Sequence, residues 1–185
     1  MQNVTLNTLA YQPFQGSETT PALFFDDYGF FSSICAGCVF TPSDWNAGIV
    51  KNDFTPEQTA WLKKVFTVAD RVRPFFEGDF YPLTDLREPP PKRTAWYHGD
   101  ASEQRWCAYQ MHRPDLDAGF VLCFRRIEVS EHLFTATLGG IDEAAEYEVE
   151  TYGGGVEKMK GAELKRLVVD LPAPRSFKLL FYRRR

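Results

Sequence analysis

Carboxylates are the residues of this chain that could do acid–base chemistry, and six of them lie where short apolar runs end. They are Asp26, Asp27, Asp44, Asp53, Glu77 and Asp79. Cleavage of a glycosidic bond, for example, needs two carboxyl groups, one to protonate the leaving oxygen and one to attack or to activate water. Asp26 and Asp27 are adjacent and would point to opposite faces of a strand, and the last two carboxylates fall in an exposed turn. The pattern therefore favours turn and capping roles for these side chains.

Cysteines could do redox or metal chemistry, since Cys35 and Cys38 form a C-x-x-C pattern. A redox dithiol would open a helix after a strand, and no helix pattern follows here. A structural zinc site would need a second pair of ligands, whereas Cys107 and Cys123 fall in a predicted hairpin. We interpret the pair as packed apolar side chains, and a thiol-redox protein is the weakest of our functional hypotheses.

The remaining chemical motifs are incomplete. His98, His112 and His132 have no metal-ligand spacing, and we place the first two in turns. No serine stands in a nucleophile elbow. The glycine run 153–155 lacks the lysine, hydroxyl residue and helix of a phosphate-binding loop. We therefore predict no catalytic residue, no metal ligand and no cofactor for this sequence.

Composition excludes several classes of partner. The chain of 185 residues is 44% hydrophobic and 25% charged and has a net charge of −4. This acidic balance argues against a nucleic-acid partner, which requires clustered Lys and Arg. The most continuous apolar stretch, 34–40, is too short to span a membrane, and we expect a cytoplasmic protein with reduced thiols. Aromatic residues make up 15% of the chain, which suits a Phe-rich core or a platform for sugar rings.

The first part of the chain contains one clear helix. Thr55 suits the N-cap, Pro56 the first helical position and Gln58 the third, so that a capping box begins a helix over 55–72. Its apolar residues recur at helical spacing along a broad stripe. Residues 1–52 show no clean period, and their apolar runs, such as 22–25 and 30–34, are typical of buried strands joined by loops.

The pattern after residue 73 is one of strands. We predict strands near 105–111, 119–126, 132–138, 146–152, 166–171 and 176–182, separated by turns rich in glycine and proline. Short strands at such intervals without helices between them predict an antiparallel β-sandwich. The side chains that we expect in or beside its core are Trp106, Tyr109, Val121, Phe124, Phe134, Tyr147, Val149, Val168, Leu179 and Phe181. The domains are then 1–72 and 73–185.

Several segments also resemble a known family. Residues 9–17 are similar to a Trp-x-Pro-x-x-Gly loop late in a (β/α)8 barrel, with Tyr11 in place of the tryptophan. Residues 28–33 are similar to an aromatic-Arg-Ser strand, with Phe31 in place of the arginine. The most specific match is 73–84, Arg-Pro-Phe-Phe-Glu-Gly-Asp-Phe-Tyr-Pro-Leu-Thr, which is similar to a junction between the last barrel helix and a sandwich, and 106–126 is similar to the first hairpin of that sandwich. In this order the segments resemble the end of a melibiase-type, family 36-like α-galactosidase.

The resemblance implies a mainly β fold. Residues 1–72 would be the last strands and last helix of a truncated (β/α)8 barrel, and 73–185 the C-terminal β-sandwich. The catalytic aspartates of the family lie on earlier barrel strands, so the chain would be a non-catalytic C-terminal fragment of an enzyme that hydrolyses terminal α-galactosides without metal or cofactor. An exposed barrel remnant would allow the fragment to self-associate.

Sugar contacts are expected from three aromatic residues, Tyr11, Phe14 and Trp45. The alternative hypothesis is a non-catalytic carbohydrate-binding or interaction module with a β-sandwich fold. In that case these residues and Trp96 would stack on a sugar ring.

Overall fold

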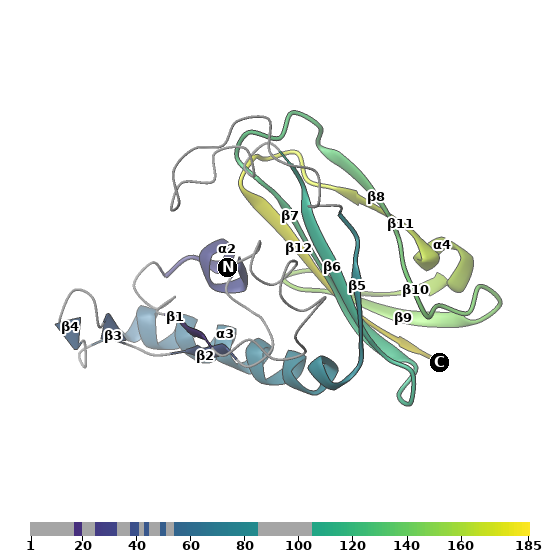
Figure 1. Cartoon of the computed structure of the whole chain (residues 1–185). Coiled ribbons are helices and arrows are strands. Elements are labelled where there is room, and N and C mark those ends of the chain that lie inside the picture. The colour runs from purple at the N-terminus through teal and green to yellow at the C-terminus, as the bar shows by residue number, and fades with distance from the viewer. Residues whose placement is uncertain are drawn as a thin grey trace. The chain divides into compact units, whose positions relative to one another are not determined.

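The computed structural model describes residues 17–19, 25–32, 38–40, 43–44, 49–50, 54–84 and 105–185 (Figure 1). The chain divides into two compact units, 1–76 and 77–185. We describe each unit by itself. No helix in the described ranges is long and apolar enough to cross a membrane.

Helix α3, Pro56–Val72, begins at the residues that the sequence indicated. The Gln58 amide N–H donates to Thr55 Oγ1 at 3.2 Å, and the Thr55 amide N–H donates to Gln58 Oε1 at 3.0 Å. This reciprocal pair is the predicted capping box, and it satisfies two of the free N–H groups at the helix start. A 3-10 turn, η2 (Arg73–Glu77), continues the chain.

The strand predicted at 30–34 is wrong, because residues Asp27–Ser32 form helix α2. Asp26 begins this helix: its Oδ2 accepts the Gly29 N–H at 3.1 Å and its carbonyl accepts the Phe30 N–H at 2.9 Å. Phe30 is fully buried, and its ring packs edge-on against Trp61 of α3 with centroids 5.8 Å apart. Packing against α3 thus outweighs the modest strand preference of this short run. Of the run 22–25, only Phe25 is described, and it lies in a turn with φ 44°.

The rest of the described first unit consists of four short strands. Ser17–Thr19 (β1) pairs in parallel with Cys38–Phe40 (β2), and Ser43–Asp44 (β3) pairs antiparallel with Ile49–Val50 (β4). The assignment of residues 1–72 to the end of a barrel stays a prediction.

The second unit contains a six-stranded antiparallel sheet in the order β10-β9-β12-β7-β6-β5. Its strands are β5 (Asp79–Pro82), β6 (Cys107–Arg113), β7 (Ala118–Arg125), β9 (Glu146–Thr151), β10 (Val156–Lys160) and β12 (Ser176–Arg184). A second sheet pairs β8 (Leu133–Thr137) with β11 (Arg166–Asp170), and the short helix α4 (Gly161–Lys165) precedes β11 (Figure 1). The predicted antiparallel β-sandwich is confirmed.

The core of the sandwich lies between these two sheets. Its members include Trp106, Val121, Tyr147, Val149, Leu164 and Tyr182. Strand β11 shows the alternation that one-sided burial requires: Leu167 and Val169 are buried, whereas Val168 is 56% exposed. The prediction of Val168 as a core residue is therefore wrong, because three consecutive apolar residues do not reveal which of them face inward.

The opposite face of the six-stranded sheet is also apolar and buried. Its residues include Tyr109, Met111, Phe120, Leu122, Phe124, Leu179 and Phe181, each at most 5% exposed. The strand register places them in common rows, for example Tyr109 beside Leu122 and Leu122 beside Leu179. Four of the predicted core residues, Tyr109, Phe124, Leu179 and Phe181, are thus buried on this face and not between the sheets.

Candidate functional site

The residues predicted to contact sugar lie outside the described part of the chain. This holds for Tyr11, Phe14 and Trp45, and also for Trp96. Of the C-x-x-C pair, Cys38 is placed in β2 by its backbone.

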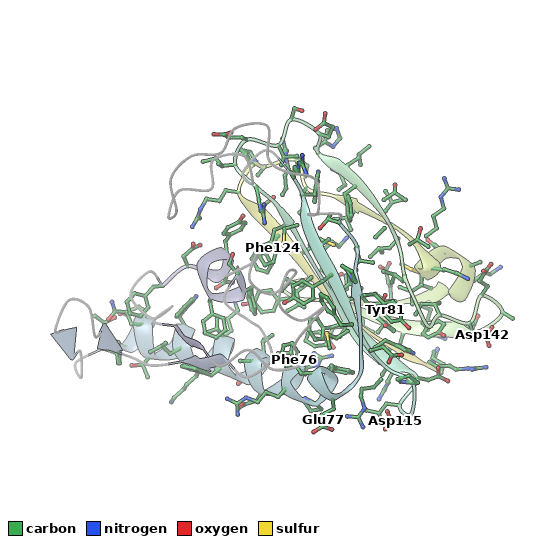
Figure 2. The ribbon with its side chains drawn as sticks, in the orientation of Figure 1. Phe76, Glu77, Tyr81, Asp115, Phe124 and Asp142 are labelled. Atoms are coloured by element: carbon green, nitrogen blue, oxygen red, sulfur yellow. The ribbon has the colours of Figure 1, made fainter. Side chains whose placement is uncertain are left out.

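Four of the six predicted carboxylates have partners that explain them structurally. Asp44 is placed in β3 by its backbone, and Asp53 lies outside the described residues. Asp26 caps α2, and Asp27 accepts the indole N–H of Trp61 at 2.6 Å. Glu77 receives an N–H from Arg113 at 3.2 Å, and Asp79 accepts the hydroxyl of Tyr81 at 3.3 Å. Figure 2 shows Glu77 close to Asp115, the other acidic partner of Arg113. The expected capping and turn roles suit these contacts better than paired acid and nucleophile roles do.

The two described cysteines outside the C-x-x-C pair are buried free thiols. They lie on neighbouring strands, with Cys123 in the inter-sheet core and Cys107 on the opposite face. Burial raises the pKa of Cys107 to about 11, and it also raises the pKa of Cys123. Both remain protonated at neutral pH, so neither is an activated nucleophile. In the described ranges, no three His, Cys, Asp or Glu residues gather as metal ligands.

The best candidate site is a buried polar cluster made by Gln110, His112 and Tyr182. Gln110 and His112 alternate on β6, so both face the same side of the sheet as Tyr182 of β12. Gln110 Nε2 lies 2.9 Å from the Gly139 carbonyl and 2.6 Å from Tyr182 Oη, and its Oε1 accepts the Gly139 N–H at 2.8 Å. Tyr182 Oη in turn lies 3.1 Å from His112 Nδ1. The cluster therefore ties two strands to the loop that contains Gly139.

Three glycines make room for this cluster. A Cβ on Gly119 would overlap the Tyr182 hydroxyl, and one on Gly139 would overlap the Tyr81 ring. Gly140 has φ 67°, and a Cβ there would lie 2.7 Å from His112 Nε2. Side chains at these positions would displace the aromatic rings or the loop.

Burial determines the protonation of the cluster. It lowers the pKa of His112, against the opposing effects of Asp117 and Asp79, and it raises the pKa of Tyr182. At neutral pH the imidazole is neutral and the phenol keeps its proton. His112 and Tyr182 are each 2% exposed, so neither lies at the surface in this arrangement. What the contacts show is a cluster that holds a loop in place.

The placement of His112 corrects the sequence prediction. We expected a turn, but β6 continues to Arg113 and pairs His112 with Gly119, so that the hairpin loop is shorter than 112–118. Polar residues at 110 and 112 on an otherwise apolar strand were the signal that could have indicated a shared face.

The ends of the strands carry ion pairs. Arg184 binds Asp117 and Asp142, each at 3.2 Å, and Arg183 binds Glu148 at 3.2 Å. Two of the three consecutive arginines 183–185 thus have acidic partners within the same unit, as suits a structural strand end.

The outward face of β8 and β11 was the natural place for an aromatic platform. Its residues are Leu133, Thr135, Thr137, Arg166, Val168 and Asp170, all exposed. None of these six is aromatic, so this face does not offer the stacking surface that a carbohydrate-binding module would use.

Known proteins resemble this chain in three-dimensional structure but show no match in sequence comparisons. No protein-family model matches the sequence, and no curated protein matches it. Among solved structures, the family 36 α-galactosidase AgaA from Geobacillus stearothermophilus, a double variant in complex with raffinose, is similar at 20% identity and a TM-score of 0.57. AgaB from the same organism gives the same identity and TM-score. The galactosidase domain of the α-galactosidase-sucrose kinase AgaSK is similar at 13% identity and a TM-score of 0.55.

Each of these matches covers 85% of this chain and 19% of the other chain. The chain thus spans about a fifth of the length of the proteins it resembles. At such low identity the likeness concerns the fold. The resemblance seen in the sequence is confirmed at that level: the chain has the fold of part of a family 36 α-galactosidase.

Proposed function

We propose that this chain forms the carboxyl-terminal part of an α-galactosidase-like glycoside hydrolase and supplies structural support, not catalytic groups. The observation that carries the proposal is the similarity in fold over 85% of the chain to structures of α-galactosidases. In the complete enzyme, the substrate class would be terminal α-galactosides. One of the similar structures is a complex with raffinose, which agrees with that class.

The side chains of the second unit support a structural role. Its buried polar residues bind one another or the backbone, as Gln110 does with Gly139. The catalytic aspartates that the family resemblance implies belong to earlier barrel strands. Sugar contacts would come from Tyr11, Phe14 and Trp45, which we propose as part of the wall of the sugar pocket.

Hydrolysis of p-nitrophenyl α-galactoside by the purified chain tests the proposal. We expect no release of nitrophenol above the buffer background. Turnover that disappears in Asp79→Asn or Asp44→Asn would overturn it, because the chain would then carry its own catalytic carboxylates. Asp115→Asn is a matched control, since Asp115 is an exposed carboxylate bound to Arg113.

Binding of α-galactosides distinguishes the alternative module. A carbohydrate-binding module would bind raffinose by itself, and Trp45→Ala or Trp96→Ala would abolish the binding. Isothermal titration with raffinose, with maltose as a non-galactoside control, measures this. Specific binding with an affinity in the micromolar range would favour the module and contradict a purely supporting role.

A further inference from the structure

We propose that Gln110, Tyr182 and His112 form a directed chain of hydrogen bonds that couples protonation of His112 to release of the Gly139 peptide. The chain begins at the backbone of Gly139, passes through two side chains and ends at an imidazole. Its direction follows from the chemistry of its donors and acceptors.

Gly139 fixes the orientation of the Gln110 amide. The Gly139 N–H requires an acceptor, which is Gln110 Oε1 at 2.8 Å, and the Gly139 carbonyl requires a donor, which is Nε2 at 2.9 Å. Rotating the amide by 180° would place N–H against N–H and oxygen against oxygen. The second N–H of Nε2 is therefore free to point at Tyr182 Oη, 2.6 Å away.

The orientation of Gln110 determines the proton positions further along the chain. Tyr182 Oη accepts from Gln110, so its own O–H is available for His112 Nδ1 at 3.1 Å. With Nδ1 as the acceptor of that O–H, the Tyr182 hydroxyl both donates and accepts, and His112 is the neutral tautomer with its proton on Nε2. The stacking of the two rings, at an interplanar angle of 14°, holds this geometry.

Protonation of His112 conflicts with this order. A proton on Nδ1 would make Tyr182 Oη accept from both His112 and Gln110, and the buried Tyr182 O–H would lose its acceptor. Leaving a buried donor without a partner is costly. The conflict is relieved if the Gln110 amide rotates so that Oε1 accepts the Tyr182 O–H, and that rotation breaks both of its bonds to Gly139. Gly140, packed against the His112 ring, would move with its neighbour.

Burial and the neighbouring carboxylates have opposite effects on the pKa of His112. The titratable groups that act on the cluster are Asp79 and Tyr81 of β5, Asp117 in the turn before β7, and Tyr147 of β9. Arg184 of β12 binds Asp117 and Asp142. The carboxylates of Asp79 and Asp117 favour the charged imidazole, and burial disfavours it more strongly, so the pKa of His112 is lowered from its ordinary value of 6.5.

The sign of the pH dependence follows from the lowered pKa. We call the form in which Gln110 holds the Gly139 peptide closed, and the form in which these bonds are broken open. Above pH 6.5 His112 is neutral in both forms, and the closed form has its full stability relative to the open one. As the pH falls below 6.5, His112 becomes protonated in the open form but stays neutral in the closed form, where its pKa is lowered. The opening equilibrium constant then rises by up to tenfold per pH unit until the lowered pKa is reached.

NMR of the full chain tests the proposal without any variant. Long-range ¹H–¹⁵N spectra should show His112 as the Nε2–H tautomer at pH 7.5. Amide exchange of Gly139, corrected for intrinsic chemistry, should show protection that decreases several-fold or more between pH 7 and pH 5.5. The Asp142 amide donates to Tyr147 Oη at 3.0 Å, outside the chain, and its protection should change little.

Two variants with matched controls complete the test. His112→Gln should remove the pH dependence at Gly139, whereas His132→Gln, at an exposed histidine bound to Asp170, should retain it. Tyr182→Phe should also remove it, whereas Tyr81→Phe deletes a hydroxyl bound to Asp79 and should not. The Nδ1–H tautomer in the unmodified protein, or unchanged pH dependence in Tyr182→Phe, would overturn the proposal even if His112→Gln does not fold.

Discussion

Replacing Arg125 with methionine should destabilise the sandwich unit by about 3 kcal/mol. Arg125 is the last residue of β7 and is 8% exposed. Its guanidinium donates five hydrogen bonds, and all of them end on backbone carbonyls. Nε and Nη2 donate to Val129 at 3.1 and 2.9 Å, Nη2 also donates to Ser130 at 3.2 Å, and Nη1 donates to Leu171 at 2.9 Å and Pro172 at 2.6 Å. One side chain thereby holds together the loop after β7 and the loop after β11.

The size of this destabilisation depends on how many of these carbonyls can form a hydrogen bond with water in the variant. The two bonds to Val129 are buried, whereas the others are partly buried. An oxygen left unsatisfied inside costs about 1 to 3 kcal/mol, and a lost bond that water can replace costs about 0.5 kcal/mol or more. Relief from burying a charge offsets part of the loss. Methionine preserves the length and apolar stem, so the change isolates the planar donor group.

Thermal unfolding of the full chain, followed by far-UV circular dichroism, measures this effect. The midpoint of thermal unfolding should fall by about 6 to 12 °C for a chain of this size. Arg166→Met is the matched control, because Arg166 is an exposed arginine on β11, and we expect a change within about 0.5 kcal/mol. Equal stabilities of the two variants would refute the view that Arg125 holds these loops together.

The other predictions concern the core, the thiols and the surface. Phe124→Ala should cost about 3 to 5 kcal/mol, because the ring is fully buried, and Val168→Ala should cost less than about 1 kcal/mol, because that side chain is exposed; urea titrations that give similar costs would contradict this. Cys107 and Cys123 should not react with a thiol reagent at pH 8 until the protein is unfolded, since burial raises both pKa values, and peptide mapping would reveal any native labelling. Self-association that increases with concentration in light scattering is expected if residues 1–72 present the apolar surface of a barrel end, and a monomer at every concentration would refute that expectation.

Local sequence signals were sufficient to predict a helix or strand where they are compatible with only one kind of local structure. Thr55, Pro56 and Gln58 specify the start of α3 because their side chains satisfy or replace particular N–H groups at a helix end. The strands at 132–138, 146–152, 166–171 and 176–182 were predicted from runs bounded by turn residues, and they are present.

Other features depend on contacts that the local sequence does not contain. Helix α2 is six residues long, and its aromatic pair is equally compatible with a strand until its packing on α3 is known. Strand β10, Val156–Lys160, lies at the edge of its sheet and is mostly exposed, so it contains few apolar residues. Without an alternating apolar pattern, the sequence did not indicate this strand. The five-residue helix α4 was missed for a similar reason, since one turn carries almost no periodic pattern.

Burial on both faces explains why the predicted core mixed two layers. All eight residues of β7 are buried, and a strand buried on both sides shows a continuous apolar run without the alternation that would assign its faces. Within such a strand, polar side chains reveal more about register than apolar ones do. Gln110 and His112 on the neighbouring β6 must share a face, and a buried glutamine requires a partner for both its oxygen and its nitrogen. The Gly139 peptide supplies both partners of Gln110. Gln110 belongs to no catalytic motif, yet its side chain fixes the position of the loop that contains Gly139 on the sheet.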